Sequence, residues 1–382
     1  MLKYNQPAEE FIPILYKGKQ NLPIKSICQI SQNELCLGTD GKGAKIFNIP
    51  KQLITDYPFD NNYLDSGTSK VHSVLKDNAG NLWIAIYQKG VMMIPAQPNS
   101  FKYIGYKSIN KNIIGSNCIT SLCRDHEGIL WIGTDNDGIY GITTELKQRV
   151  HYAPHDSPSS VPSTVFGLYE DSERNLWFGS YTNGLGRLDK KTGQCSYLQN
   201  LTDKHGNRIQ RVYDLVEDQD KRLWIATMGA GLFYYDLKTG QSVYDPKFNA
   251  ATEKYKWISC LLYAGDNHLY VGTYDGIRCI DLSTDDFKTE EILSRHIIHS
   301  LYEDPQGNIW IGSSDGLAEW NPQTRQLKTY TTAHGLSSNA VYAIKGDGQD
   351  NLWISTNAGM SRFNLNTHTF SNFYADDGLQ RK

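Results

Sequence analysis

The stretch Asp304-Pro305-Gln306-Gly307-Asn308-Ile309-Trp310-Ile311-Gly312-Ser313 is the clearest copy of a pattern that recurs along the whole chain. Each copy has an apolar strand, an Asp, a short turn that often contains Gly-Asn, a Leu-Trp-Ile-Gly-Thr segment or a variant of it, and then Gly-Leu. Six copies centre on a Trp, and two degenerate copies have Tyr270 or Cys36 at that position. The anchor positions are residues 36, 83, 131, 177, 224, 270, 310 and 353, which lie 40–48 residues apart. Eight repeats therefore account for nearly the whole chain.

Each repeat contains four short β-strand signals and no helical signal. In the copy around Trp131 these signals are residues 119–123, 130–134, 139–142 and 149–152, called strands a to d below. No segment keeps a period of about 3.6 residues for ten residues, so helices should be scarce. Repeats of this length with four strands are typical of propeller blades, which must stack because one blade cannot bury both of its faces. The sequence predicts an all-β fold, a β-propeller of four-stranded antiparallel blades. We expect residues 1–382 to form one domain of eight blades, with seven blades plus a displaced repeat as the alternative.

Both ends of the chain have the character of cut repeats. Residues 11–16 have the pattern of a strand d with no blade before it, and this strand either completes the last blade beside residues 369–374 or is left over from a preceding blade. Residues 374–382 begin the link to another strand a and then stop. We therefore expect this chain to be a truncated part of a longer repeat array.

The residues that recur in every copy have structural explanations. The repeated Asp opens the turn between strands a and b, where a short carboxylate accepts hydrogen bonds from backbone N–H groups. The repeated Trp should fill the space between neighbouring blades. The Gly that starts strand c should supply the positive φ that the b–c turn needs. Six equivalent carboxylates spread around a ring cannot converge on one substrate, so we assign none of them a catalytic role.

Composition excludes several classes of protein. The chain has 38 Lys and Arg, 41 Asp and Glu and a formal net charge of −3, so it lacks the excess of basic residues that is typical of nucleic-acid-binding proteins. It has no apolar run long enough to span a membrane and no apolar core of a signal peptide at its start. Its seven Cys form no C-x-x-C pair, and its His residues form no recognisable ligand set, so the sequence predicts no cofactor and no metal.

The repeat V/I-x-x-L-x-x-D-x-x-G-N-L-W-I-G-T-x-x-G-L is similar to those of the two-component regulator propeller family. The clearest copies are residues 298–317 and 341–360, joined by His334-Gly335-Leu336-Ser337-Ser338-Asn339, and the resemblance covers about residues 24–375. It implies the extracytoplasmic sensor region of a hybrid two-component histidine kinase from a polysaccharide-using bacterium, located in the periplasm. It also implies an oligosaccharide ligand, a kinase outside this chain, a neighbouring propeller and β-sandwich as partners, and a possible homodimer.

A ligand should lie where the b–c turns and the d–a loops meet, because irregular loops converge there over a rigid scaffold. Trp257 is notable because it lies outside the repeated Trp position. Sugar recognition needs an aromatic platform and planar polar groups, and the residues of this end that supply those types are Trp257, Tyr274, Asp275, Tyr181, Asn183, Arg211 and Asp137. Strand a contributes a further series that should line the central channel: Lys25, His72, Thr120, Phe166, Tyr213, Ser259, His299 and Tyr342.

The function that fits these observations is a ligand-sensing domain without catalytic activity of its own. A polysaccharide-acting propeller enzyme, such as a glycosidase or lyase, and a protein-interaction scaffold are the alternatives. The segment Gly312-Ser313-Ser314-Asp315-Gly316 matches the G-x-S-x-G nucleophile elbow, but that elbow needs a turn from a strand into a helix. This segment aligns instead with the b–c turn of the preceding repeat.

Overall fold

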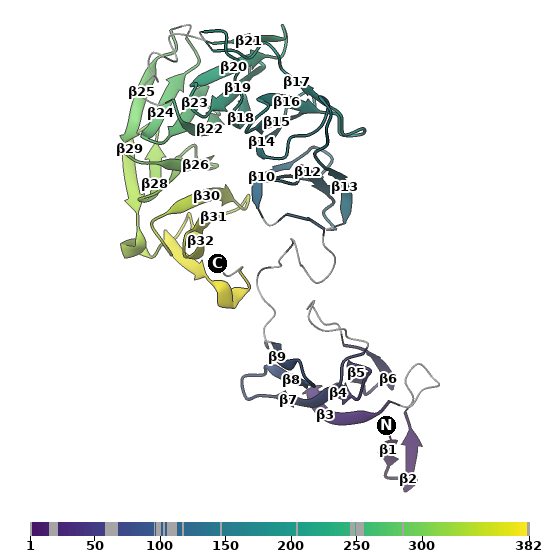
Figure 1. Ribbon diagram of the computed structural model, residues 1–382. Coiled ribbons are helices and arrows are strands. Elements are labelled where there is room, and N and C mark those ends of the chain that lie inside the picture. The colour runs from purple at the N-terminus through teal and green to yellow at the C-terminus, as the bar shows by residue number, and fades with distance from the viewer. Residues whose placement is uncertain are drawn as a thin grey trace. The chain divides into compact units, whose positions relative to one another are not determined.

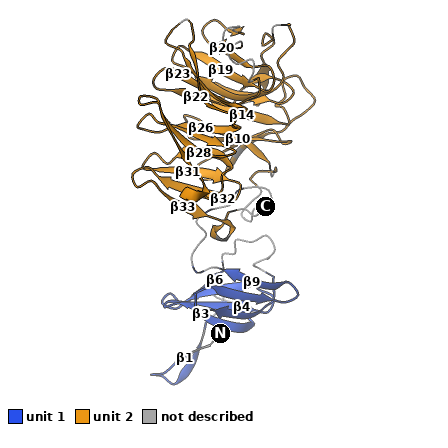
Figure 2. Cartoon of the chain, turned by 90° about the vertical axis from the view of Figure 1, so that its left-hand side faces the viewer, with its two compact units in different colours: residues 1–112 blue, residues 113–382 orange. Residues whose placement is uncertain are grey.

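The computed structural model describes two compact units, Met1–Asn112 and Ile113–Lys382, which we call unit 1 and unit 2 (Figure 2). The described residues are 2–14, 22–57, 68–94, 96, 101, 104, 113–116, 118–145, 147–203, 205–244, 249, 256–284 and 286–379. Helical structure is sparse, as predicted, and includes 3-10 turns at Thr332–His334 (η2) and Ala375–Asp377 (η3). Within the described residues, no helix has the length and apolar character needed to span a bilayer.

Unit 2 contains six sheets, each of four sequential antiparallel strands, which confirms the predicted blade. The first blade is β10 (Ile119–Arg124), β11 (Leu130–Thr134), β12 (Ile139–Ile142) and β13 (Gln148–Tyr152), close to the four predicted segments. The others are β14 (Val165–Glu170), β15 (Leu176–Ser180), β16 (Leu185–Leu188), β17 (Cys195–Tyr197); β18 (Val212–Glu217), β19 (Arg222–Thr227), β20 (Leu232–Asp236), β21 (Gln241–Val243); β22 (Ile258–Ala264), β23 (His268–Thr273), β24 (Gly276–Asp281), β25 (Thr289–Ser294); β26 (Ile298–Glu303), β27 (Ile309–Ser313), β28 (Gly316–Asn321), β29 (Gln326–Tyr330); and β30 (Val341–Gly346), β31 (Asn351–Thr356), β32 (Gly359–Asn364), β33 (Thr369–Phe373).

The six blades of unit 2 follow one another around a common axis (Figure 1). The innermost strand of each blade lies beside the innermost strand of the next, in the order β10, β14, β18, β22, β26 and β30. The strands β13, β17, β21, β25 and β29 lie on the outside (Figure 1). This is the radial arrangement expected of a propeller, with strand a nearest the axis.

Unit 1 contains two further repeats and a hairpin. One repeat is a four-stranded sheet, β3 (Ile24–Ser31), β4 (Glu34–Thr39), β5 (Ala44–Asn48) and β6 (Leu53–Asp56). The other is three-stranded within the described residues, β7 (Val71–Lys76), β8 (Leu82–Ile86) and β9 (Gly90–Ile94). The strand predicted at residues 11–16 is present as β2 (Glu10–Pro13), and it pairs with β1 (Leu2–Asn5), a partner that the sequence did not suggest. The prediction that all eight repeats close into one ring stays a prediction.

The repeated Asp and the repeated Trp are joined by a direct hydrogen bond. In five repeats the Trp indole N–H donates to the carboxylate of the Asp six residues earlier, at 2.7–2.8 Å. The same carboxylate accepts backbone N–H groups of its own turn, such as that of Asn175 on Asp171 at 2.7 Å. The predicted turn role of the Asp is therefore correct, and the carboxylate also fixes the orientation of the ring that packs against the next blade.

The predicted packing role of the ring is confirmed in unit 2. Here Trp131, Trp177, Trp224, Tyr270 and Trp310 are each 3% exposed or less. Each ring packs against the following blade, as Trp224 does with Ile258 and Leu269.

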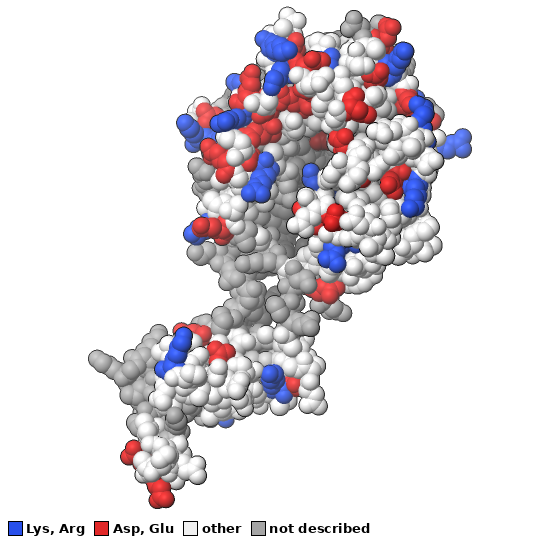
Figure 3. All heavy atoms as spheres, turned by 180° about the vertical axis from the view of Figure 1, so that it is seen from behind, with Lys and Arg blue, Asp and Glu red and all other residues white. Residues whose placement is uncertain are grey.

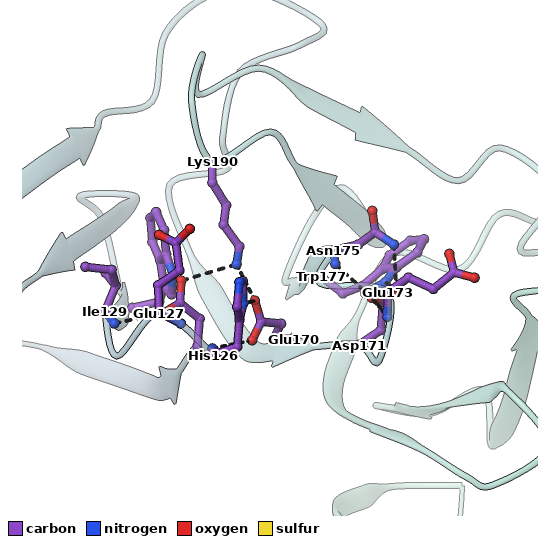
Figure 4. A network of polar contacts seen from close by, with 11 residues as sticks. His126, Glu127, Ile129, Glu170, Asp171, Glu173, Asn175, Trp177 and Lys190 are labelled. Atoms are coloured by element: carbon purple, nitrogen blue, oxygen red, sulfur yellow. Dashed lines mark hydrogen bonds and ion pairs between the residues drawn. The ribbon is translucent and has the colours of Figure 1, made fainter.

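Polar contacts at the a–b end connect neighbouring blades (Figure 4). The Glu170 carboxylate, at the end of β14, accepts the backbone N–H of His126 in the preceding blade at 2.7 Å. The Lys190 ammonium binds both Glu170 and Asp125, so it spans the same junction. Glu217 repeats the arrangement one blade later, accepting the backbone N–H of Ser172 at 2.6 Å. These contacts fix the register between blades at the end opposite the b–c turns.

A hydroxyl contact closes the b–c turn of every blade in unit 2. The side chain that ends strand b donates to the carbonyl of the Gly that begins strand c, as in Ser180 to Gly184 at 3.0 Å and Thr273 to Gly276 at 2.8 Å. These Gly residues have positive φ, 79° at Gly184 and 130° at Gly276, as predicted. The turns that carry candidate ligand-binding residues therefore have a defined backbone.

Replacing Asp171 with Ala should lower the free energy of unfolding by about 2–3 kcal/mol, because the buried indole N–H of Trp177 and two turn N–H groups lose their acceptor. Urea denaturation monitored by Trp fluorescence measures the change. The matched control is Glu173→Ala in the same turn, whose exposed side chain should contribute less than about 0.5 kcal/mol. Equal effects of the two substitutions would contradict the role assigned to the carboxylate.

Candidate ligand-binding site

Two positions of the repeat meet at the b–c end of each blade. The residue directly after strand b donates its backbone N–H to the carbonyl of the residue directly before strand a. Examples are Tyr274 to Trp257 at 3.2 Å and Met228 to Arg211 at 3.1 Å. Side chains at these positions therefore gather around the mouth of the propeller, as the sequence predicts for Trp257, Tyr274 and Arg211.

Five aromatic side chains of three neighbouring blades form two groups of contacting rings at this mouth. We call Tyr181, Phe166, Tyr213, Tyr274 and Trp257 the aromatic arc. Phe166 contacts Tyr181 edge to face at a centroid distance of 5.8 Å and stacks on Tyr213 of the next blade at 4.8 Å. In the second group, the ring centroids of Trp257 and Tyr274 lie 6.0 Å apart at an interplanar angle of 30°. Burial raises the pKa of the Tyr213 hydroxyl, and the charge of the Tyr274 phenol adds to the shift.

The arc presents aromatic surface to solvent. Tyr181, Tyr274 and Trp257 are 42–46% exposed, while Phe166 and Tyr213 are partly buried beneath them. Arg211 extends the arc at one end, with its guanidinium carbon 5.0 Å from the centroid of the Tyr181 ring. Because the five rings come from the blades β14–β17, β18–β21 and β22–β25, the surface depends on how these blades pack.

Two further predicted residues lie beside the arc. Asn183 is exposed in the same turn as Tyr181, and its backbone N–H donates to Ser180 Oγ at 2.8 Å. Asp275 follows Tyr274, and its backbone N–H donates to Thr273 Oγ1 at 3.1 Å. Six of the seven predicted residues are thus brought to this part of the mouth. The sequence assigned Phe166 and Tyr213 only to the channel lining, although their adjacent places in the strand a series could have indicated a shared stack.

Asp137 lies apart from the arc, in the blade β10–β13, where its contacts are structural. Its carboxylate accepts the Tyr140 hydroxyl, and His151 Nε2 lies 3.4 Å from its Oδ1. The Tyr140 and His151 rings stack at 3.9 Å. Burial and the bond to Asp137 together raise the pKa of Tyr140 to about 12. Asp137, Tyr140 and His151 thus stabilise this end of the blade, and the Asp137 carboxylate already has two side-chain partners.

Asp214 is an acidic residue to which the sequence pattern assigns no role. It follows Tyr213 directly and occupies a strand a position that holds small residues in other repeats, such as Ser121, Gly167 and Cys260. Its carboxylate accepts the N–H of Leu215 at 2.9 Å and that of Leu261 in the next blade at 2.8 Å. Burial raises its pKa to about 6, although those two N–H groups and the charge of Lys345 oppose the shift. A titratable group therefore joins the two blades that carry most of the arc.

The turn that matches the nucleophile-elbow motif is a b–c turn between β27 and β28, as predicted. His299 Nε2 lies 3.1 Å from Ser314 Oγ, and burial lowers the pKa of this imidazole. Among the described residues, no carboxylate forms a hydrogen bond or ion pair with the other nitrogen of His299. Those residues also contain no cluster of three or more His, Cys, Asp or Glu arranged to hold a metal ion.

The repeats match a known family model. The model described as "Two component regulator propeller" matches residues 113–136, 159–182, 208–229, 292–315 and 335–358, all in unit 2. Each of these segments contains strands a and b of one blade. Unit 2 contains two-component regulator propeller repeats.

Among the solved structures with a similar fold are extracellular domains of bacterial signalling proteins. The extracellular domain of BT3049 of B. thetaiotaomicron, described as a hybrid two component system, is 23% identical, with a TM-score of 0.78 over all of this chain and 50% of that one. The extracellular domain of BT4673 from the same organism is 19% identical, with a TM-score of 0.62 over 98% of this chain and 52% of that one. At these identities the likeness shows the fold.

A curated relative is "Histidine kinase P4" of Formosa agariphila, which is 23% identical over 325 residues. The match takes in 82% of this chain but 20% of that protein. The regulator propeller repeats described here thus correspond to a minor part of a much longer chain.

Replacing Asp214 with Asn should change how stability depends on pH. The native pKa of about 6 lies above the ordinary Asp value of 3.8, so the native state holds this proton more tightly than the unfolded chain. The ionised carboxylate therefore costs stability as the pH rises from about 4 through 6. The Asn amide has one acceptor oxygen and cannot serve both the Leu215 and the Leu261 N–H groups, so the substitution also carries a pH-independent cost. We expect the stability of Asp214→Asn relative to the parent chain to rise by roughly 2–3 kcal/mol between pH 4 and pH 8. Urea unfolding over this range measures the difference, and a difference that does not vary with pH would contradict the assignment.

Proposed function

We propose that this chain is the ligand-sensing part of a two-component receptor, located outside the cytoplasm, and that it binds an oligosaccharide at the aromatic arc. The repeats belong to a family named for two-component regulators, and similar structures are extracellular domains of such systems. The chain spans a fifth of a relative named as a histidine kinase, so the kinase activity of the whole receptor would reside outside this chain.

The observation that carries the proposal is the arc of partly exposed rings across three blades. Aromatic faces bind the apolar face of a sugar ring, and neighbouring hydroxyl, amide and guanidinium groups bind its hydroxyls. Trp257 and Tyr274 offer one such surface, and Tyr181 with Arg211 offers another. Both surfaces lie at the same mouth, so a ligand longer than one sugar could contact both.

Binding across blades offers a physical route for a signal. A ligand that contacts three blades would favour one packing arrangement of those blades over others, and an equilibrium can shift only by such a difference in affinity. Asp214 sits at the same junction and bonds to the backbone of the next blade. We propose that ligand binding tightens this junction, and that adjoining parts of the receptor, including a possible second copy, respond to it.

Calorimetric titration of the chain with neutral and acidic oligosaccharides, followed by product analysis, tests the function. We expect saturable binding and recovery of intact oligosaccharide. Recovery of shortened products would overturn the sensor proposal in favour of a polysaccharide-acting enzyme. A lack of binding across both kinds of oligosaccharide would also overturn it.

Replacing Trp257 with Ala should weaken oligosaccharide binding about five- to thirtyfold, because stacking on an exposed indole contributes roughly 1–2 kcal/mol to ligand binding. The fold should be retained, since the side chain is 46% exposed. The matched control is Tyr374→Ala, which removes a side chain of equal exposure far along the chain from the arc. Unchanged affinity of the Trp257 variant would show that the ligand binds elsewhere.

A further inference from the structure

Arg211 and Arg222 both contact aromatic rings in unit 2, but they differ in their ion pairs. Arg222 also lies over rings, but its guanidinium pairs with Asp218 at 2.6 Å and with Asp220 at 3.1 Å. Arg211 rests on Tyr181, and no carboxylate of the described residues forms an ion pair with it. Its N–H donors are therefore available to a ligand at the edge of the arc.

The backbone on both sides of Arg211 is held in place. The Arg211 carbonyl accepts the N–H of Met228 at 3.1 Å, and the carbonyl of Gln210 accepts the N–H of Gly184 at 2.8 Å. Val212, the next residue, is fully buried at the start of β18. The guanidinium is thus positioned on a ring of the preceding blade. A positioned planar guanidinium binds a carboxylate or sulfate through two parallel N–H···O bonds.

Basic side chains outnumber carboxylates slightly in the loops around the arc. The described Lys and Arg in its b–c turns and d–a loops are Arg208, Arg211, Lys256 and Arg295, and the described carboxylates there are Asp156, Asp203 and Asp275. Asp203 already accepts the N–H groups of His205 and Asn207, each at 2.8 Å. On the face of unit 2 shown in Figure 3, acidic and basic side chains are interspersed rather than gathered by sign. An anionic ligand would therefore be recognised by particular side chains and not by a general positive field.

We infer that the aromatic arc and Arg211 together bind an acidic oligosaccharide, in which a carboxylate or sulfate group on one sugar pairs with Arg211 while other rings stack on Tyr274 and Trp257. This inference rests on the proposed function and adds the chemical class of the ligand. Under this inference Arg211 determines the preference for charged over neutral oligosaccharides, whereas Trp257 contributes to the binding of both kinds.

Calorimetry with three probes tests the inference: oligogalacturonides, the same oligomers with methyl-esterified carboxyl groups, and carrageenan oligosaccharides, whose charged groups are sulfates alone. At least one of the two anionic probes should bind ten or more times more tightly than the esterified probe. Which anionic probe binds distinguishes carboxylate from sulfate. The affinity should fall as NaCl is raised, because partly exposed charges are screened.

Arg211→Gln should lose at least tenfold in affinity for the anionic probe and leave binding of the esterified probe unchanged. Arg211→Lys keeps the charge without the planar fork and should fall between the two. The matched control is Arg187→Gln, which removes an arginine that also lies over a ring, Trp177 at 6.0 Å, on strand β16 of the same blade as Tyr181. This control should bind as the parent chain does.

The possible failures are distinguishable. Equal binding of the anionic and esterified probes, or an Arg211→Gln variant with unchanged affinity, would overturn the inference and leave the oligosaccharide proposal intact. Failure of all three probes, together with failure of neutral oligosaccharides, would overturn both.

Discussion

The hydrogen bond from a Trp indole to the carboxylate six residues earlier links the local turn to the packing of whole blades. The Asp satisfies the backbone donors of the a–b turn, so the hairpin can form with a buried tip. The other oxygen of the same carboxylate holds the Trp ring at a fixed angle over the next blade, where the ring is excluded from water. A hairpin and an interface that would otherwise need separate determinants therefore depend on one side-chain pair. The repetition of this pair places successive blades at similar spacing.

With one end of each blade fixed in this way, the opposite end is free to vary. The repeated Asp residues, together with the ion pair between Lys190 and Glu170, stabilise the a–b end. The b–c turns need only a hydroxyl and a Gly to keep their backbone conformation. Side chains directly after strand b and directly before strand a can then change from repeat to repeat at little cost in stability. The aromatic arc and Arg211 occupy these variable positions and the adjacent part of strand a. The constancy of one end thus makes a specific surface possible at the other.

Much of the fold could be predicted because its determinants are local and periodic. The blade around Trp131 has strands within a residue or so of the predicted ones, since turn chemistry and burial both repeat there. The candidate site was only partly predictable. Trp257 was recognised because it departs from the repeat, but Phe166 and Tyr213 were not, since their stack joins two blades. Asp137 carries a suitable group for sugar recognition, yet its neighbours Tyr140 and His151 engage it. Asp214 was overlooked because the equivalent residues of strand a in other repeats, such as Ser121 and Gly167, share only their small size.

The sequence by itself determined the blade: its four strands, its Asp-opened turn, its buried ring and the Gly with positive φ. These features depend on contacts within about fifty residues, and eight copies make the pattern unmistakable. Only the tertiary structure decided which mouth residues meet, and which charged groups stay unpaired or become buried. Tyr181 and Arg211 lie thirty positions apart and belong to different blades, so their contact depends on how one blade is rotated against the next. That rotation results from packing between sheets, a non-local property that side-chain identity along one strand does not specify.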